Sequence, residues 1–137
     1  MPHDPALVAE TRDWLTRASK DLEAAERLMI GASPLPTQAA FHAQQTAEKS
    51  QKGFLTWHKQ IFPKTHDLSE LGPKCASVDA TLGPVSSSVA RFSRYAIQTR
   101  YPGSWAQPTV AEAQEAIRLA RDMFDAVIAR LPDEVKP

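Results

Sequence analysis

The sequence lacks several features that would place it in a specialised class of proteins. Its 137 residues include a single cysteine, Cys75, so an internal disulfide is excluded and a reducing compartment, by default the cytoplasm, is expected. No apolar run approaches the roughly 20 residues of a membrane-spanning helix. The start of the chain has neither the basic nor the apolar region of a signal peptide. We therefore expect a soluble protein without a membrane partner.

Familiar catalytic and cofactor motifs are also missing. The sequence contains no phosphate-binding P-loop, no dinucleotide-binding glycine pattern and no nucleophile elbow. Its four histidines have no spacing typical of a zinc site, since none stands four residues from another beside a glutamate or cysteine. We expect neither a metal nor a cofactor.

Net charge is zero, but its distribution along the chain is uneven. Residues 49–100 carry eight Lys/Arg against three Asp/Glu, whereas both flanking segments are acidic. A neutral protein with a basic middle is not typical of indiscriminate polyanion binding, and it allows a local site for an anionic ligand. The alternative is a solvated basic surface without a ligand.

The pattern of apolar residues indicates helices throughout. No segment alternates apolar and polar residues as a half-buried strand does, and prolines separate helical windows at 5–30, 37–57, 85–99 and 109–131. A further short helix is expected after Asp67, broken or restarted by Gly72-Pro73, whose role the sequence leaves open. We predict one domain over residues 1–137, an all-α, up-and-down antiparallel bundle of four to five helices.

Two capping signals mark helix starts. Thr109 with Glu112 forms a Ser/Thr-x-x-Glu capping box before the last helix, and Asp67 with Glu70 has the same spacing before the short helix. The last helix has the clearest apolar stripe of the chain, because apolar residues recur at steps of three and four from Val110 to Leu131.

The second predicted helix combines packing residues with charge. One of its faces carries polar residues between apolar ends, namely Phe41, Gln45, Glu48, Lys52 and Leu55, with Lys49 at the edge. Polar groups on a packing face are expensive unless they are paired, so this pattern favours a functional cluster. The alternative is an ordinary surface ion pair between Glu48 and Lys52, worth a few tenths of a kcal/mol.

Further cations flank this helix in the sequence. Lys64 and His66 precede the short third helix, and Arg94, Arg100 and Tyr101 lie around the end of the fourth. An antiparallel bundle can bring these segments together. Such a cluster would hold a phosphate well, because arginine supplies a bidentate fork and lysine a point charge.

Three segments resemble a known family. Residues 41–52 contain Q-x-x-E-K-x-x-K, residues 64–68 read K-T-H-D-L, and residues 100–102 read R-Y-P. These motifs, with Trp14, Ala18, Asp21, Leu22 and Ala25 in the first helix, look like those of the HEPN (higher eukaryotes and prokaryotes nucleotide-binding) domain. The resemblance covers roughly residues 10 to 131, and three motifs in the right order make it fairly specific.

The resemblance implies a helical bundle that dimerises, with the polar face of the second helix near a cleft at the dimer interface. It also implies a link to nucleotides and, in toxin–antitoxin pairs, to a separately encoded minimal nucleotidyltransferase. The ligand would be a nucleotide or RNA phosphate. On this hypothesis the binding residues are Gln45, Glu48, Lys49, Lys52, Lys64, His66, Arg100 and Tyr101.

One departure from the family bears on catalysis. Members that are metal-independent ribonucleases carry R-x(4–6)-H near the end of the fourth helix, and here neither Arg94 nor Arg100 is followed by such a histidine. We therefore rank a binding module above an RNA-cleaving toxin, in which His66 and Arg100 would be the candidate catalytic residues. The third alternative is a structural dimerisation module with a buried polar network.

Overall fold

The all-α prediction is confirmed. A computed structural model describes residues 2–98, 102–103 and 105–137, and within these residues every regular element is a helix. The elements are α1 (Pro5–Leu28), α2 (Pro36–Trp57), α3 (Leu68–Val78), η1 (Ala80–Leu82), α4 (Gly83–Ala90), α5 (Tyr95–Gln98), α6 (Val110–Ile128) and η2 (Asp133–Val135). Among the described residues, no helix is both long and apolar enough to cross a lipid bilayer.

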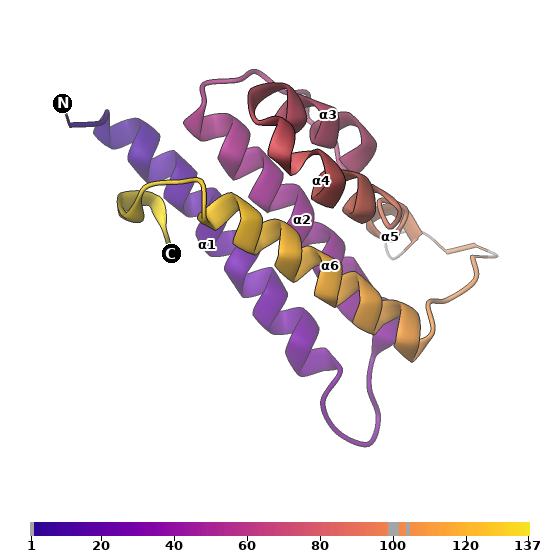
Figure 1. Cartoon of the computed structure of the whole chain (residues 1–137). Coiled ribbons are helices and arrows are strands. Elements are labelled where there is room, and N and C mark those ends of the chain that lie inside the picture. Colours follow the sequence, from indigo (N-terminus) through magenta and orange to yellow (C-terminus); the bar gives the residue numbers. More distant parts are fainter. Residues whose placement is uncertain (1, 99–101, 104) are drawn as a thin grey trace.

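The two longest helices, α1 and α2, form an antiparallel hairpin (Figure 1). Both begin with a proline in the first turn, where a missing N–H costs no helical hydrogen bond. Small residues allow the helices to approach closely. A Cβ atom added at Gly53 would lie 3.0 Å from Leu15 Cδ2, closer than ordinary packing allows. The hairpin therefore brings side chains of α1 directly against those of α2.

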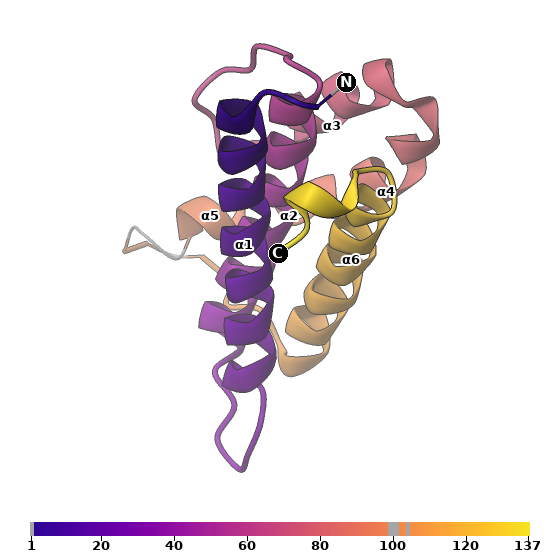
Figure 2. The same ribbon diagram turned by 90° about the vertical axis from the view of Figure 1, so that its left-hand side faces the viewer.

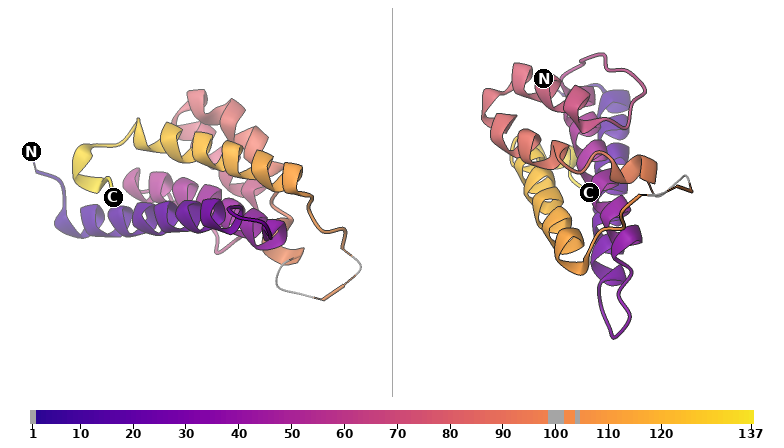
Figure 3. Two further views of the ribbon diagram at one scale, coloured as in Figure 1. Left: turned by 90° about the horizontal axis from the view of Figure 1, so that it is seen from below. Right: turned by 90° about the vertical axis from the view of Figure 1, so that its right-hand side faces the viewer.

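Helix α2 is the central element of the bundle. Helices α1 and α6 pack on it, and Figure 2 shows α6 on one side of the α1–α2 hairpin and α5 on the other. Figure 3 shows the same layers from below. As a result α2 is buried almost all round. From Ala43 to Thr56 only Lys49 is more than marginally exposed.

Helix α6 begins as predicted. The Thr109 hydroxyl accepts a hydrogen bond from Glu112 N at 3.0 Å, and the Glu112 carboxylate accepts one from Thr109 N at 3.0 Å. These bonds satisfy two backbone donors at the helix start. The bond from the Thr109 backbone also lowers the pKa of Glu112. The start of α6 is thus fixed by local interactions.

The predicted break at Gly72-Pro73 is wrong, because α3 runs through Pro73 without interruption. The proline removes one hydrogen bond, to the carbonyl of the exposed Ser69, which water can solvate. Glycine before the proline avoids the clash that a Cβ atom would make there. It also lets α4 approach, since a Cβ atom at Gly72 would lie 3.1 Å from Ser86 Cβ.

The predicted helix over residues 85–99 is instead two helices, α4 and α5, joined by a turn at residues 91–94. Bonds from each N–H to the third residue before it tighten this turn, as in Phe92 N to Val89 O at 3.2 Å and Tyr95 N to Phe92 O at 3.2 Å. Val89, Phe92 and Ala96 nevertheless all remain buried, as their spacing predicted.

Candidate functional site

A buried carboxylate organises the polar residues of α2. Glu48 has a side chain only 3% exposed, and its Oε2 accepts a hydrogen bond from Lys52 Nζ at 3.1 Å. Its Oε1 accepts bonds from Gln44 Nε2 at 3.3 Å and Gln45 Nε2 at 3.4 Å. We call Gln44, Gln45, Glu48, Lys52 and His66 the Glu48 network. The pair of Glu48 and Lys52 is therefore not the ordinary surface pair that the sequence allowed as an alternative.

The fifth member of the network comes from the strap, which we define as residues 58–67 between α2 and α3. His66 Nδ1 lies 2.9 Å from Glu48 Oε1, and Gln44 Nε2 donates to the His66 carbonyl at 2.8 Å. The His66 side chain remains 49% exposed, and Lys64 is exposed two residues before it. The network thus runs from a buried carboxylate to a histidine at the surface.

The strap ends in a helix start capped by Asp67, as predicted, although the side chain bonds Ser69 and not the predicted partner Glu70. Asp67 Oδ1 accepts bonds from the Ser69 hydroxyl at 2.6 Å and Ser69 N at 2.9 Å, and these bonds lower the pKa of Asp67. Ser93 Oγ accepts a hydrogen bond from Leu68 N at 2.7 Å and so ties the turn before α5 to the start of α3, next to the strap. These contacts hold the backbone on which His66 sits.

Lys52 is covered by an aromatic ring of α1. Its Nζ lies 5.6 Å from the centroid of the Trp14 ring, and the Trp14 and Phe62 rings meet edge-on at 6.5 Å. Trp14 belongs to α1 and Phe62 to the strap, so the ring that covers this lysine also contacts the strap. The Lys52 side chain is only 8% exposed as a consequence.

A second charged group lies between α1 and α2. Asp21 Oδ2 accepts a hydrogen bond from Lys49 Nζ at 2.6 Å, and Asp21 Oδ1 lies 2.8 Å from His42 Nδ1. We call Asp21, His42 and Lys49 the Asp21 cluster. Lys49 therefore has an acidic partner from α1 rather than from its own helix.

The structure brings together five of the eight residues predicted from the sequence. Gln45, Glu48, Lys52 and His66 are in the Glu48 network, and Lys49 is in the Asp21 cluster. Lys64 lies beside them on the strap. Arg100 and Tyr101 lie outside the residues that the structure describes.

Sequence reasoning missed three residues of this region. Gln44 is fully buried and bonds both Glu48 and the strap, Asp21 holds two α2 side chains, and Trp14 covers Lys52. Gln44 stands four residues before Glu48, a helical spacing that could have identified it. The partners from α1 depend on how the two helices are rotated against each other, which the sequence alone does not specify.

Comparison with known families decides what kind of domain this is. A family model described as the HEPN domain matches residues 11–131, which is nearly the whole chain. The chain belongs to the HEPN domain family. No curated protein and no solved structure matches it in the corresponding comparisons. The resemblance inferred from the sequence motifs is confirmed.

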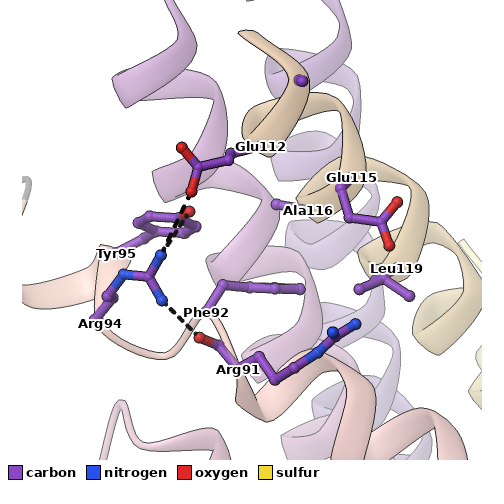
Figure 4. Close-up of a pocket in the computed structure, with 9 residues that line it drawn as sticks. Arg91, Phe92, Arg94, Tyr95, Glu112, Glu115, Ala116 and Leu119 are labelled. Atoms are coloured by element: carbon purple, nitrogen blue, oxygen red, sulfur yellow. Dashed lines mark hydrogen bonds and ion pairs between the residues drawn. The ribbon is translucent and has the colours of Figure 1, made fainter. Parts of the chain in front are cut away.

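The HEPN domain also has a pocket away from these polar groups. It has a volume of ≈ 330 Å³ and lies between the turn at residues 91–94 and α6 (Figure 4). Arg94 is held there by protein groups. Its Nη1 donates to the Arg91 carbonyl at 2.9 Å, and its guanidinium lies 4.7 Å from the Tyr95 ring centroid. Arg94, which the sequence analysis grouped with the other cations, lines this pocket, whereas none of the eight predicted binding residues does.

Two other titratable groups of the HEPN domain are structural. Cys75 is fully buried, and burial raises the pKa of its thiol to about 12, so the reactive thiolate is suppressed. Burial also lowers the pKa of His58, whose ring packs 4.5 Å from that of Phe54. Cys75 is therefore part of the core.

Proposed function

We propose that this HEPN domain binds the phosphate of a nucleotide or of RNA beside His66 and Lys64. The observation that supports this most is the His66 ring, half exposed while its Nδ1 is held by the buried Glu48 carboxylate. In the imidazolium form, Nδ1–H donates to Glu48, and the positive charge of the half-exposed ring attracts a phosphate beside it. Hydrogen bonds between charged partners are the strong ones.

The remaining residues of the proposed site have different roles. Lys52 and Lys49 neutralise the carboxylates of Glu48 and Asp21, so that neither acid repels an anionic ligand. Gln45 is nearly buried and steadies Glu48 through its amide. Arg100 and Tyr101 stay in the proposed site on the strength of the R-Y-P motif, as a phosphate fork and a stacking or hydrogen-bonding ring.

The assembly that we propose is a homodimer working with a separately encoded nucleotidyltransferase in the cytoplasm. The support is family membership. Sedimentation velocity of the purified chain tests the first part. A monomer at all concentrations would contradict it.

Calorimetric titration with adenosine nucleotides tests the binding proposal. His66→Ala is expected to weaken binding about tenfold or more, the loss expected for one hydrogen bond between charged groups. Lys136→Ala removes a positive charge near the end of the chain, next to Asp133, and serves as the control that leaves affinity unchanged. If the wild-type protein gives no heat of binding at millimolar nucleotide, the proposal is wrong.

RNA cleavage is a second candidate function, and one observation supports it. A carboxylate that holds Nδ1 of a half-exposed histidine is an arrangement suited to general acid–base chemistry. Neutral His66 would take the proton of a ribose 2′-hydroxyl while that oxygen attacks the adjacent phosphorus. The bond to the 5′-oxygen then breaks and that oxygen takes a proton from water, giving a 2′,3′-cyclic phosphate and a 5′-hydroxyl, while the hydroxide left by the water takes the proton from His66.

Incubation with labelled single-stranded RNA separates this candidate from simple binding. Cleavage predicts fragments with 2′,3′-cyclic ends from the wild-type protein and none from His66→Ala. If the wild-type protein binds the RNA but the RNA stays intact, the cleavage candidate is wrong and the binding proposal remains.

A further inference from the structure

The pocket between the turn at residues 91–94 and α6 has an apolar floor. Four of the residues that line it are each no more than 7% exposed, namely Phe92, Tyr95, Ala116 and Leu119. The rings of Phe92 and Tyr95 lie nearly parallel, with centroids 6.2 Å apart and planes at 18°. The volume of ≈ 330 Å³ is at the lower end of the range of about 300–1,000 Å³ that is usual for small-molecule sites. The floor therefore offers contact to a small apolar group.

Four charged residues are also among those that line the pocket, and three of them have partners of opposite charge. Glu115 Oε1 accepts a hydrogen bond from Arg118 Nη2 at 2.7 Å, and Glu115 Oε2 accepts one from Arg118 Nε at 3.0 Å. Arg94 Nη2 lies 4.0 Å from Glu112 Oε2. Both acidic side chains of the pocket are thus neutralised by arginines.

Arg91 is the fourth charged residue, and its guanidinium keeps open donors. Its Nε donates to the Ser88 carbonyl at 3.2 Å, whereas Nη1 and Nη2 have no hydrogen-bond acceptor among the residues that the structure describes. In Figure 4 this side chain extends along the pocket toward α6, on the side away from Glu112. The hydrogen bond from Arg118 lowers the pKa of Glu115, and the charge of Arg91 lowers it further. An arginine fork with both terminal nitrogens open is suited to binding a carboxylate through two hydrogen bonds.

Other classes of ligand fit this pocket less well. A cation would meet carboxylates that arginines already neutralise. A doubly charged phosphate would place two negative charges near Glu112 and Glu115, whereas Arg91 supplies a single positive charge. A purely apolar molecule would leave the donors of Arg91 unused. A monoanion with an apolar body matches both the floor and the arginine.

We infer that the pocket between the turn at residues 91–94 and α6 binds a small monocarboxylate with an apolar or aromatic body. Nη1–H and Nη2–H of Arg91 bind the carboxylate, and the apolar body lies on Phe92 and Leu119. The pocket shares no lining residue with the Glu48 network, so the inference does not depend on the proposed phosphate site.

Titration of the isotope-labelled protein with 4-phenylbutyrate, followed by nuclear magnetic resonance, tests the inference, because the backbone signals report where the ligand binds. Saturable shifts are expected at residues 91–95 and 111–119, with a dissociation constant in the millimolar range or below. Two related probes separate the contributions. 4-Phenylbutan-1-ol lacks the charge and butyrate lacks the ring, and each is expected to bind about tenfold or more weakly than 4-phenylbutyrate.

Variants of Arg91 identify the group that holds the carboxylate. Arg91→Ala is expected to weaken 4-phenylbutyrate about tenfold or more and to leave the affinity for 4-phenylbutan-1-ol unchanged. Arg91→Lys keeps the charge without the fork, so its affinity should lie between those of wild type and Arg91→Ala. Arg17 is a matched control, because it is an exposed arginine of α1 that pairs with Asp13. Arg17→Ala is expected to change neither affinity.

The same spectra show whether each variant is folded. Arg91 is exposed, and its side chain bonds only the Ser88 carbonyl among the described residues, so the spectrum of Arg91→Ala should match that of wild type outside the pocket. A folded Arg91→Ala variant with wild-type affinity for 4-phenylbutyrate would overturn the inference.

Three further results would also overturn it. Equal affinity for the acid and the alcohol means that the pocket takes an apolar group without help from Arg91. Saturable shifts confined to the strap, around Lys64 and His66, assign the anion to the proposed phosphate site and remove this one. No saturable shift of any signal at millimolar 4-phenylbutyrate removes the carboxylate site and leaves the proposed function as it stands.

Discussion

At the scale of single residues, the burial of the charged Glu48 side chain sets the cost of losing water against the gain from pairing. Removing a carboxylate and an ammonium from water costs several kcal/mol for each ion, and their mutual attraction offsets this only when further hydrogen bonds complete the pair. Glu48 meets that condition. Lys52 binds its Oε2, and its other oxygen, Oε1, is bound by Gln44, Gln45 and His66. The network is therefore stable as a unit and sensitive to the loss of any one charge.

Removing one member of the buried pair should be far costlier than removing both. Glu48→Ala is expected to lower the free energy of unfolding by ~3–5 kcal/mol, because Lys52 stays buried without a counter-charge. The double variant Glu48→Leu with Lys52→Met should lose much less than the sum of the single changes. Urea denaturation followed by circular dichroism measures these differences.

The exposed pair of Glu23 and Arg27 is a matched control with the same four-residue spacing. Glu23→Ala should change the free energy of unfolding by less than ~0.5 kcal/mol. Equal effects of Glu48→Ala and Glu23→Ala would contradict the view that burial makes the difference. If Glu48→Ala destabilises the fold but leaves nucleotide affinity intact, the network is structural only.

The sequence predicted which residues belong to the Glu48 network better than it predicted that they are buried. Spacing alone placed Gln45, Glu48 and Lys52 on one side of a helix, and the expected antiparallel bundle brought His66 near them, a residue that the family motif also contains. Nothing in the sequence predicted that Trp14 would cover Lys52 or that Asp21 would bind Lys49. Both contacts depend on the relative rotation of α1 and α2, which side-chain packing along the whole hairpin decides.

At the scale of helices, α3 carries a proline where helices usually exclude it. Pro73 is the sixth residue of α3, so its missing N–H leaves the Ser69 carbonyl without its helical partner. The prediction of a broken helix was wrong here because the energetic cost of a proline inside a helix depends on the residues around it. Gly72 and the solvent-facing Ser69 both reduce that cost. The starts of α1, α3 and α6, by contrast, follow from local signals that the sequence displays directly.

Pro73→Ala should therefore raise stability. The new N–H can donate to the Ser69 carbonyl, and we expect a gain of ~1 kcal/mol after the added freedom of the unfolded chain is subtracted. Pro36 opens α2, where its fixed φ suits the first turn, so Pro36→Ala should instead cost ~0.5 kcal/mol. Thermal melts of both variants check the opposite signs. A loss of stability in Pro73→Ala would mean that the proline ring packs productively against α4.

At the scale of the whole molecule, the basic middle of the sequence does not become one cationic surface. Lys49 and Lys52 are neutralised beside α2, and Arg94 is held at the pocket next to α6, 4.0 Å from Glu112. Lys64 remains exposed on the strap. A zero net charge with few exposed cations at the proposed site predicts contact with only a few phosphates.

The salt dependence of RNA binding should accordingly be shallow. If two phosphates are neutralised, the logarithm of the association constant for hexauridylate falls by about 1.4 for each tenfold rise in salt, since a single strand contributes roughly 0.7 per phosphate. Fluorescence anisotropy over a range of potassium chloride concentrations measures this slope. A slope of about −4 or steeper would indicate a broad polyanion surface instead.

Helix α2 lies at the centre of the core and also carries most of the described residues of the proposed site. It therefore constrains how the sequence of this domain can diversify. Almost any change along residues 43–56 disturbs packing before it alters a ligand contact. The strap and the outward side of α1 have no such constraint. Members of a lineage descended from this chain should therefore acquire new ligand preferences by substitution in the strap, while α2 stays nearly fixed.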